Sequence, residues 1–375
     1  MLYTDKMKKK ILFIMNSMDG GGAERILIDV LRNFDYDRYE VDLVLIYGVG
    51  VYMEDIPSQV NYLGAIYTEG SYIYGNEPII WSEWPNESRA IKQLVKGYYD
   101  TIVSFIEGYA ARFHKYLLDQ ASNNVSWVHI DLYVNHWSRE CYKSDKEESE
   151  VYTLMDKVVF VSQSALEAFR CLFYYSKDNL IVINNPIDKK RITRLSKEQK
   201  VLKECFSFVA VGRLCQQKRY DRMLKAAKII YDRGCSFSLS ILGVGELENE
   251  IKDLACELEI DDRIHLLGFK RNPYPYIKNA DVFLLSSDAE GFPTVICEAM
   301  TLGVPVVGTN VTGTRDLLGN SEYGILTDLS PESFAEAMYL LYINTKERAY
   351  YADMSEERAK SLSVENAMRH IYSIL

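Results

Sequence analysis

Short hydrophobic runs alternate with stretches of helical periodicity along the whole chain. In the first half, the runs that predict strands cover residues 11–15, 41–46, 101–105, 125–128, 157–161 and 180–183. Hydrophobic residues recur at helical spacing between several of these runs, as in AERILIDVLRNF. Strands that alternate with helices are typical of βαβ units around a parallel sheet.

The same alternation starts again after a charged stretch near 185–203 that has no hydrophobic periodicity. The tail from 345 to 375 is predicted to be helical throughout. A chain of 375 residues exceeds what one hydrophobic core usually serves. We therefore expect two α/β domains joined by this linker, with a ligand cleft between them. The strands predicted for the second domain are 206–211, 237–242, 263–267, 281–285, 304–307 and 323–326.

Residues 66–85 break this pattern, because they are rich in Tyr, Trp, Gly and Pro and show no strand alternation. We interpret them as a long aromatic insertion in the first domain. Aromatic rings are suited to a sugar platform or to a belt at a membrane interface. A loop that packs on its own domain is the plainer interpretation, and it is favoured.

Charge and composition narrow the range of functions. A net charge of -10 argues against nonspecific nucleic-acid binding, which needs a basic surface. No hydrophobic run approaches the roughly 18 residues that span a bilayer, and the short run after the basic N-terminus has no cleavage site. The cysteines are scattered without a C-x-x-C pair, which favours a reducing compartment over a disulfide framework. We therefore expect a cytoplasmic protein.

Two carboxylates, Glu290 and Glu298, flank a predicted helix start in the stretch AEGFPTVICEAM. Pro293 suits the first turn of a helix, and Gly291 lets the preceding loop turn tightly against a ligand. The helix start follows a predicted strand, at the sheet edge where parallel α/β folds bind ligands, and its N–H groups attract anions. The two carboxylates are therefore placed to hold the two ends of a nucleoside diphosphate sugar. The alternative is that both are ordinary surface carboxylates.

Three further motifs lie at predicted strand ends. VGRLCQQK contains Arg213 and Lys218, two cations that can neutralise a leaving diphosphate without a metal ion, unless the loop is simply solvated. The glycines at 20–22 allow the backbone to approach a phosphate or a sugar, or they form a plain tight turn. His129 can donate a hydrogen bond to a sugar hydroxyl, unless it is a core histidine.

Two other patterns do not meet the requirements of the sites that they resemble. GVGELE resembles the dinucleotide-binding fingerprint, yet Glu248 occupies the position of its third glycine. The spacing of His129, His136 and Cys141 matches no common metal site. We therefore predict no dinucleotide cofactor and no bound metal.

Taken together, these motifs resemble glycosyltransferase family four, the retaining GT-B enzymes. The second half of the chain matches nearly throughout, and the first half matches mainly at its first strand and at WVHID. VINNPID departs from the usual Asn-Gly, because Pro186 takes the glycine position. The matching segments are GGGAER, WVHID, VINNPID, VGRLCQQK, ILGVGELENEI, HLLGF followed by NPYPYIKNADVFLLSS, and AEGFPTVICEAMTLGVPVV with GTRDLL.

The resemblance implies the GT-B fold, in which two Rossmann-like, doubly wound α/β domains face a central cleft. Residues 1–185 would form the acceptor-binding domain and residues 186–345 the nucleotide-sugar domain. Helices in 346–375 would cross back to the first domain. The hydrophobic anchors of this tail are Tyr350, Leu362, Ala367 and Ile371.

The resemblance also implies roles for single residues. Arg213 and Lys218 would hold the donor diphosphate. Glu298 would bind the ribose hydroxyls and Glu290 the transferred sugar, while His129 would contact that sugar near the reacting carbon. The catalytic residues would be His129, Arg213, Lys218 and Glu290. The other donor contacts would be Gly21, Gly22, Gly243, Gly268, Phe269, Gly291, Phe292, Pro293 and Thr294.

The implied reaction moves a sugar from a nucleotide sugar, with UDP as the favoured nucleotide, and needs no essential metal. Retention of the anomeric configuration is implied as well. The acceptor would be a saccharide or a lipid-linked saccharide in surface polysaccharide synthesis, such as capsule formation, at the inner face of the cell membrane. The stretch RAIKQLVKGYY at 89–99 is either an amphipathic contact with anionic lipid or, as we favour, an ordinary surface helix.

Two other functions are compatible with the same motifs. One is a GT-B-fold epimerase or phosphorylase that acts on similar ligands. The other is a non-catalytic subunit that binds a partner transferase, although the presence of Arg213, Lys218, Glu290 and Glu298 argues against it.

Overall fold

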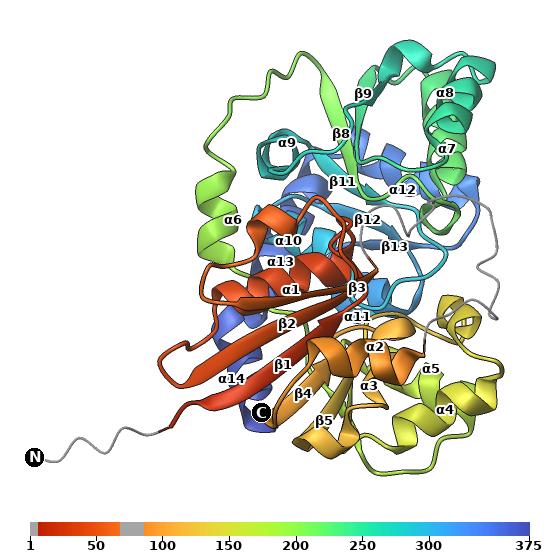
Figure 1. The fold of residues 1–375 in the computed structure, drawn as a ribbon. Coiled ribbons are helices and arrows are strands. Elements are labelled where there is room, and N and C mark those ends of the chain that lie inside the picture. Colours follow the sequence, from red (N-terminus) through yellow and green to blue (C-terminus); the bar gives the residue numbers. More distant parts are fainter. Residues whose placement is uncertain (1–6, 68–85) are drawn as a thin grey trace, which may run out of the picture. The chain divides into compact units, whose positions relative to one another are not determined.

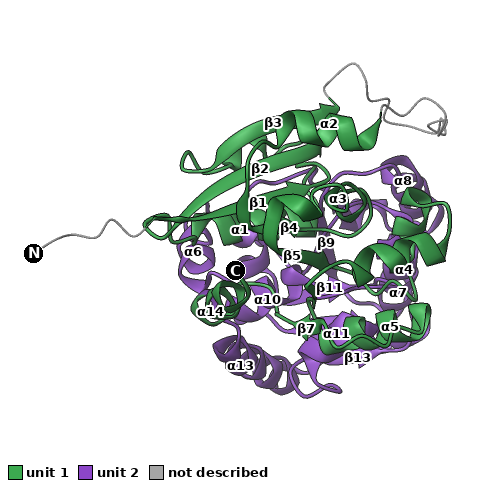
Figure 2. Cartoon of the chain, turned by 60° about the horizontal axis from the view of Figure 1, so that its bottom comes forward, with its two compact units in different colours: residues 1–186, 365–375 green, residues 187–364 purple. Residues whose placement is uncertain are grey.

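The computed structural model of the chain describes residues 7–67 and 86–375 (Figure 1). The main part of the predicted aromatic insertion, 68–85, lies outside the described residues. The chain divides into two compact units, residues 1–186 with 365–375, and residues 187–364 (Figure 2). Each unit is built on one parallel sheet, as expected from the alternation of strands and helices.

Unit 1 contains a seven-stranded sheet in the order β3-β2-β1-β4-β5-β6-β7. The run from Ile11 to Met15 is completely buried in its centre, because a parallel sheet is covered on both faces. Its strands are β1 (Lys9–Met15), β2 (Tyr39–Tyr47), β3 (Asn61–Tyr67), β4 (Tyr99–Ser104), β5 (Ala121–Val128), β6 (Lys157–Phe160) and β7 (Leu180–Val182). Its helices are α1 (Gly22–Arg32), α2 (Glu87–Leu94), α3 (Tyr109–His114), α4 (Asp145–Thr153), α5 (Gln163–Phe173) and α14 (Val364–Ile374).

The strand β3 was not predicted from the sequence. It is an edge strand with little buried surface, and Gly64 interrupts it with a φ of +120°. The register with β2 shifts between Leu43 and Val44. A glycine and an irregular register weaken the strand pattern, which explains why the hydrophobic periodicity did not reveal it.

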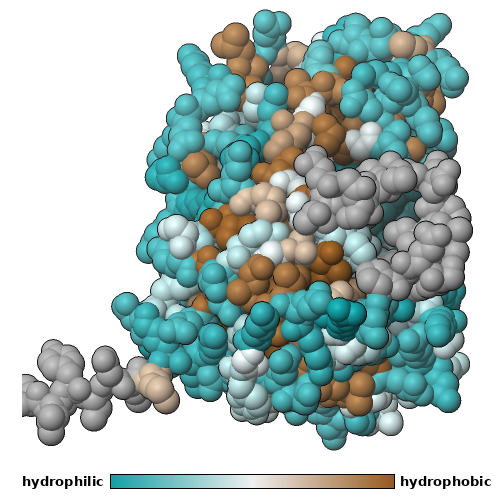
Figure 3. Space-filling view, viewed as in Figure 1, coloured by the Kyte–Doolittle hydropathy of each residue, from teal (hydrophilic) through white to brown (hydrophobic). Residues whose placement is uncertain are grey.

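Unit 2 contains a six-stranded sheet in the order β10-β9-β8-β11-β12-β13. The helices α7 and α8, at the upper right of Figure 3, present mainly hydrophilic residues outward and turn their buried residues to the sheet. Its strands are β8 (Phe206–Val211), β9 (Phe237–Leu242), β10 (Ile264–Leu266), β11 (Val282–Leu285), β12 (Val306–Thr309) and β13 (Ile325–Thr327). Its helices are α6 (Lys189–Leu195), α7 (Tyr220–Asp232), α8 (Glu248–Glu257), α9 (Tyr274–Asn279), α10 (Thr294–Thr301), α11 (Thr312–Leu318), α12 (Pro331–Ile343) and α13 (Thr345–Ser361).

The helical tail passes from unit 2 to unit 1 at residue 365, whereas we expected this change at residue 346. The helix α13 packs on α10 and belongs to unit 2, and only residues 365–375 join unit 1. There the Tyr372 ring stacks on Tyr39 at a centroid distance of 5.4 Å. Of the predicted anchors, Leu362, Ala367 and Ile371 are buried, whereas Tyr350 is 50% exposed and anchors nothing.

The helix α2 corresponds to the stretch that we considered for membrane contact. Its hydrophobic residue Ile91 and the following Val95 are completely buried in the core of unit 1. Lys92 forms an ion pair with Asp119, with 3.3 Å between Nζ and Oδ1. The hydrophobic side of α2 therefore packs inside unit 1, which favours an ordinary surface helix. Within 7–67 and 86–375, no helix is long and hydrophobic enough to cross a bilayer.

Candidate functional site

Three glycines follow the strands β8, β9 and β10 at the carboxyl edge of the unit 2 sheet. The N–H of Gly243 donates to the carbonyl of Gly268 at 3.0 Å. A Cβ on Gly243 would lie only 1.9 Å from the carbonyl oxygen of Gly212. The backbones of the strand-end loops therefore approach too closely for side chains, and Gly243 adopts a φ of +149° that favours glycine.

The loop after β8 and the loop after β11 meet through an ion pair between two predicted site residues. The Nζ of Lys218 lies 2.6 Å from Oε1 of Glu290. The hydroxyl of Ser287, which is buried, donates to the same carboxylate oxygen at 2.6 Å. Glu290 itself is only 7% exposed. The structure thus brings together a cation and a carboxylate that are 72 residues apart in the sequence.

Further polar contacts hold these two loops together. Gln217 donates through its side chain to the carbonyl of Ala289 at 2.7 Å. Asp288 accepts from Arg219 at 2.8 Å and from Arg222 at 2.7 Å. These contacts fix the loop geometry around the ion pair described above, and sequence reasoning did not identify them.

The helix α10 starts next to this ion pair. Pro293 is its N-cap rather than a residue of its first turn, and a proline side chain offers no acceptor to the N-terminal N–H groups. The preceding turn rests on Gly313, where a Cβ would lie 2.2 Å from the carbonyl oxygen of Gly291. The N–H of Gly313 also donates to the carbonyl of Glu290 at 3.1 Å. The start of α10 is therefore a positioned set of backbone donors, as an anion site requires.

Glu298 lies further along α10, with 8% of its surface exposed. Its Oε1 accepts a hydrogen bond from the hydroxyl of Tyr274 at 3.1 Å. Tyr274 is the first residue of α9 and is itself buried. The phenol therefore holds the Glu298 carboxylate in one orientation, which favours a fixed binding role over that of a solvated surface carboxylate.

The other predicted donor contacts of unit 2 lie at the same sheet edge. Arg213 is exposed just past β8. Gly268 has a φ of +69°, and a Cβ there would meet no atom within 4 Å, so the space beside it is open. Phe269 follows it and is partly buried. Phe292 is 7% exposed, and Thr294 is the first residue of α10.

In unit 1, His129 directly follows β5 at the carboxyl edge of its sheet. Its backbone N–H donates to Oε2 of Glu107 at 2.8 Å. The other oxygen of Glu107 accepts from the indole N–H of Trp137 at 2.8 Å. Glu107 is 2% exposed, and this burial raises the pKa of its carboxyl group. A Cβ on Gly108 would lie 2.7 Å from the Trp137 ring, so the indole packs directly on this turn.

The His129 imidazole is held in a neutral form. Burial lowers its pKa to about 3. Its Nε2 atom is buried and has no hydrogen-bond partner among the described residues, while the ring lies 5.1 Å from the ring of Phe105. A neutral imidazole whose Nε2 atom has no partner can donate or accept one hydrogen bond with a ligand, depending on its tautomer.

The loop between β1 and α1 contains three glycines, which differ in how much space a side chain would have. Gly20 adopts a φ of +99°, and a Cβ on Gly21 would lie 2.4 Å from the Glu24 carboxylate. A Cβ on Gly22 would meet nothing within 4 Å. The loop geometry therefore explains glycine at 20. The flexible Glu24 side chain can move away from a Cβ on Gly21, and open space beside Gly22 leaves room for a ligand to approach.

The predicted site residues thus form two groups, one in each unit, and each group lies at the carboxyl edge of its own sheet. His136, whose spacing from His129 and Cys141 matched no common metal site, lies 2.7 Å from a carboxylate oxygen of Glu148. Across the parts of the chain that the structure describes, no three His, Cys, Asp or Glu side chains form a group that could hold a metal ion. Sequence reasoning missed Glu107, Ser287 and Tyr274. A carboxylate directly after a strand, in SFIEGY, was a signal that could have revealed Glu107.

Comparison with known proteins finds glycosyltransferases. Residues 192–358 match the family model of the glycosyl transferases group 1. An uncharacterized glycosyltransferase from Haemophilus influenzae is 25% identical over 375 residues, which cover 98% of this chain and 100% of that protein. The Campylobacter jejuni N-acetylgalactosamine-N,N'-diacetylbacillosaminyl-diphospho-undecaprenol 4-alpha-N-acetylgalactosaminyltransferase is 31% identical over 57% of this chain and 58% of its own length.

A solved structure shows the same fold. The crystal structure of Anabaena Alr3699/HepE in complex with UDP and glucose superimposes with a TM-score of 0.78 at 21% identity, covering 97% of this chain and 98% of the other. With the family match, this similarity supports a glycosyltransferase of the family-four type, and the fold of the chain is the two-domain α/β GT-B fold.

Proposed function

We propose that the chain transfers a sugar from a UDP-sugar to a saccharide or lipid-linked saccharide acceptor, with retention and without an essential metal ion. The observation that carries this proposal is the Lys218–Glu290 pair, at 2.6 Å, beside the uncapped start of α10. The HepE structure contains UDP and glucose. The Campylobacter relative is named for a diphospho-undecaprenol acceptor. Both likenesses support a nucleotide-sugar donor and a glycan acceptor in this chain.

In this proposal, charge stabilisation of the leaving diphosphate supplies most of the catalysis. Lys218 and Arg213 bind the diphosphate oxygens, and the N–H groups at the start of α10 add further donors. When Lys218 pairs with the diphosphate instead of with Glu290, the Glu290 carboxylate becomes available to accept hydrogen bonds from the sugar hydroxyls. Glu298, oriented by Tyr274, accepts hydrogen bonds from the ribose hydroxyls.

The neutral His129 contacts the transferred sugar near the reacting carbon. Glycosyl transfer develops positive charge at this carbon, as in other oxocarbenium-like transition states. An imidazolium there would repel that charge, whereas a neutral imidazole can orient a hydroxyl without this penalty. The low pKa of His129 suits this role.

Two protein cations next to the diphosphate also account for the metal independence that we propose. They supply the positive charge that a divalent ion supplies in other phosphate sites. An acceptor attached to a lipid would bring the chain to the cytoplasmic face of a membrane, through the acceptor rather than through α2.

A nucleotide panel followed by a transfer assay tests the proposal. We expect UDP and UDP-sugars, but not GDP or ADP, to raise the melting temperature of the full chain. Radiolabel from the preferred donor should then appear in an extended glycan, and EDTA should not stop the transfer. Label in an isomerised nucleotide sugar or in a sugar phosphate would instead support an epimerase or a phosphorylase. Nucleotide binding without any transfer or hydrolysis would support a non-catalytic subunit.

A further inference from the structure

One face of the unit 2 sheet carries polar side chains over three neighbouring strands. The strand register places Val209 of β8, Ser240 of β9 and His265 of β10 side by side, with Ser207 and Ser238 in the next row. Strands of parallel sheets are usually hydrophobic on both faces, because helices cover both. Here the opposite face is hydrophobic and packs on α7 and α8. The polar face therefore requires a separate explanation.

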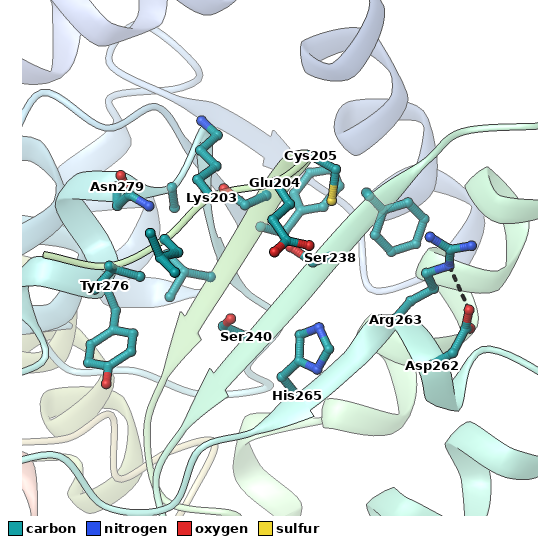
Figure 4. Close-up of a pocket in the computed structure, with 17 residues that line it drawn as sticks. Lys203, Glu204, Cys205, Ser238, Ser240, Asp262, Arg263, His265, Tyr276 and Asn279 are labelled. Atoms are coloured by element: carbon teal, nitrogen blue, oxygen red, sulfur yellow. Dashed lines mark ion pairs between the residues drawn. The ribbon is translucent and has the colours of Figure 1, made fainter.

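A cavity of about 370 Å³ lies on this polar face (Figure 4). The strands form its floor, and the segment 201–205 and the helix α9 form its walls. Figure 4 shows the Glu204 carboxylate extending toward Ser238, with Ser240 and His265 on the strands beside them. The volume falls within the usual range of small-ligand pockets.

The cavity is separate from the donor site described above. Its lining residues extend from the amino ends of the strands, such as Ser207 in β8 and Ser238 in β9, to mid-strand Ser240. The ion pair of Lys218 and the strand-end glycines lie past the carboxyl ends. None of the predicted donor contacts lines this cavity.

The chemistry of the lining favours a neutral, hydroxyl-rich ligand over an anion. Lys203 already pairs with Asp281 at 2.8 Å, and Arg263 pairs with Asp262 at 3.1 Å. Both cations are therefore neutralised by carboxylates. An anionic ligand would have to compete with these carboxylates, whereas an uncharged ligand would not.

Hydrogen-bonding groups that are suited to sugar hydroxyls remain available. The side chains of Ser238, Ser240, His265 and Glu204 have no hydrogen-bond partner within residues 7–67 and 86–375. Together they offer donors and acceptors on two sides of one hollow, and Tyr276 of α9 adds an aromatic ring. Hydrophobic residues such as Val209 also line the cavity, so the preference for a saccharide rests on the unpaired hydroxyl, imidazole and carboxylate groups.

We propose that this cavity is a second saccharide site, which holds one or two sugar units of a glycan away from the transfer site. The serine hydroxyls, the imidazole of His265 and the carboxylate of Glu204 bind the sugar hydroxyls. The proposal concerns binding alone, so it stands or falls independently of the transfer activity.

Saturation-transfer NMR on the full chain tests this site with neutral trisaccharides of glucose, of galactose and of N-acetylglucosamine. At least one trisaccharide should bind, and saturating UDP should not displace it. His265→Ala and Ser240→Leu should each weaken its binding by about fivefold or more, since each lost hydrogen bond contributes about that factor. His265 is exposed, so His265→Ala keeps the test valid if Ser240→Leu does not fold. The matched control is His370→Ala, at an exposed histidine of α14.

Three outcomes would overturn the proposal. The first is that none of the trisaccharides binds. The second is that UDP displaces the bound trisaccharide, which would assign binding to the transfer site. The third combines two results. His265→Ala leaves the trisaccharide affinity unchanged, and Ser240→Leu abolishes a concentration-dependent self-association that sedimentation detects in the wild-type chain. This face would then be an interface between copies of the chain.

Discussion

The carboxyl edge of the unit 2 sheet is organised by charged groups, whereas the edge of the unit 1 sheet at His129 is organised by a neutral ring and one buried carboxylate. In unit 2, Lys218 and Glu290 lie 2.6 Å apart, with Lys218 partly exposed and Glu290 buried. In unit 1, Glu107 accepts the backbone N–H of His129 and the indole N–H of Trp137, and both of these donors are uncharged. The two edges are thus prepared for ligand groups of different charge.

This difference matches the charges that the proposed reaction develops. The leaving diphosphate needs cations that can move to it, and an ion pair with a nearby carboxylate keeps such a cation in place before the donor binds. The sugar carbon becomes positive, so the group beside it should be neutral.

Lys218→Ala should have the largest effect, because it removes a cation from the leaving group. We expect transfer to fall by about a thousandfold, the upper range for the loss of one electrostatic stabiliser in an active site. The measurement is kcat with the UDP-sugar that the nucleotide panel selects. Lys225→Ala is the matched control, because Lys225 lies on α7 with half of its side chain exposed.

A loss below about tenfold in Lys218→Ala would remove this lysine from the proposed catalytic group. Since Glu290 is buried and loses its ion-pair partner in this variant, a thermal melt must first show that the variant is folded. A folded but inactive variant would then separate catalysis from stability.

The two glutamates of unit 2 should differ in what they bind. Glu298→Ala should weaken the binding of bare UDP by about ten- to several hundredfold, because it removes charge-assisted bonds to the ribose hydroxyls. Glu290→Ala should leave bare UDP binding nearly unchanged and lower transfer by about a hundredfold. Calorimetry with UDP and turnover with the UDP-sugar measure the two properties.

The structure sharpens this second comparison. Glu290 restrains Lys218, so its removal frees a cation for the diphosphate, and UDP affinity in Glu290→Ala should not fall. Equal losses of UDP binding in both variants would reject the division of roles. If neither variant lost UDP binding or transfer, both residues would be ordinary carboxylates without a role in the reaction.

The buried histidines of unit 1 should make its stability sensitive to acid. His114 is fully buried, and burial lowers its pKa to about 4. Below pH 6.5 the unfolded chain binds a proton that the folded chain does not bind, so stability falls as the pH drops toward 4. The loss is on the order of 3 kcal/mol for this group.

Denaturant unfolding between pH 7.5 and pH 4.5 measures this loss. The pH dependence should become flatter in His114→Asn and should stay unchanged in His370→Asn, because His370 is exposed. Part of the slope should remain in His114→Asn, since burial lowers the pKa of His129 as well. An unchanged slope in His114→Asn would mean that this ring is already protonated in the folded protein.

The sequence predicts the fold more completely than it predicts the contacts within the candidate site. Hydrophobic runs predicted the strands of both sheets except β3, because central strands of a parallel sheet are continuous hydrophobic segments. The predicted residue at which the tail joins unit 1, 346, was less accurate, because the structure places it at 365. The amphipathic pattern does not say which unit a helix covers, and α13 packs on α10 instead of crossing.

The site residues of unit 2 could be proposed because they lie in two family motifs at strand ends. Their pairing could not be predicted, since Lys218 and Glu290 meet only after β8 and β11 become neighbours in the sheet. The only signal for Glu107 was a carboxylate directly after a strand. Its role depends on contacts with Trp137 and with the backbone of His129, which the sequence alone does not show.

The smallest predicted effect concerns Glu107, which positions His129 without touching the ligand. The carboxylate accepts the N–H groups of both His129 and Trp137, at 2.8 Å each. In Glu107→Gln the side chain keeps its shape, but one of its two ends becomes a donor and must face another N–H group. We expect kcat to fall by about tenfold while UDP affinity stays unchanged, because a small displacement of a positioned group is enough to slow the reaction.

The indole N–H resonance of Trp137 provides a readout that a general loss of stability would not reproduce. It should shift in Glu107→Gln and stay unchanged in the control Glu140→Gln, an exposed glutamate in the same part of the chain. Protonation of Glu107 would have the same effect as the substitution, since it also converts one acceptor into a donor. The raised pKa of this carboxyl brings such protonation closer to neutral pH. Wild-type activity should therefore decline on mild acidification, while the Glu107→Gln variant should lack this step. An identical decline in both proteins would show that Glu107 does not act through its charge and that another group causes the acid limb.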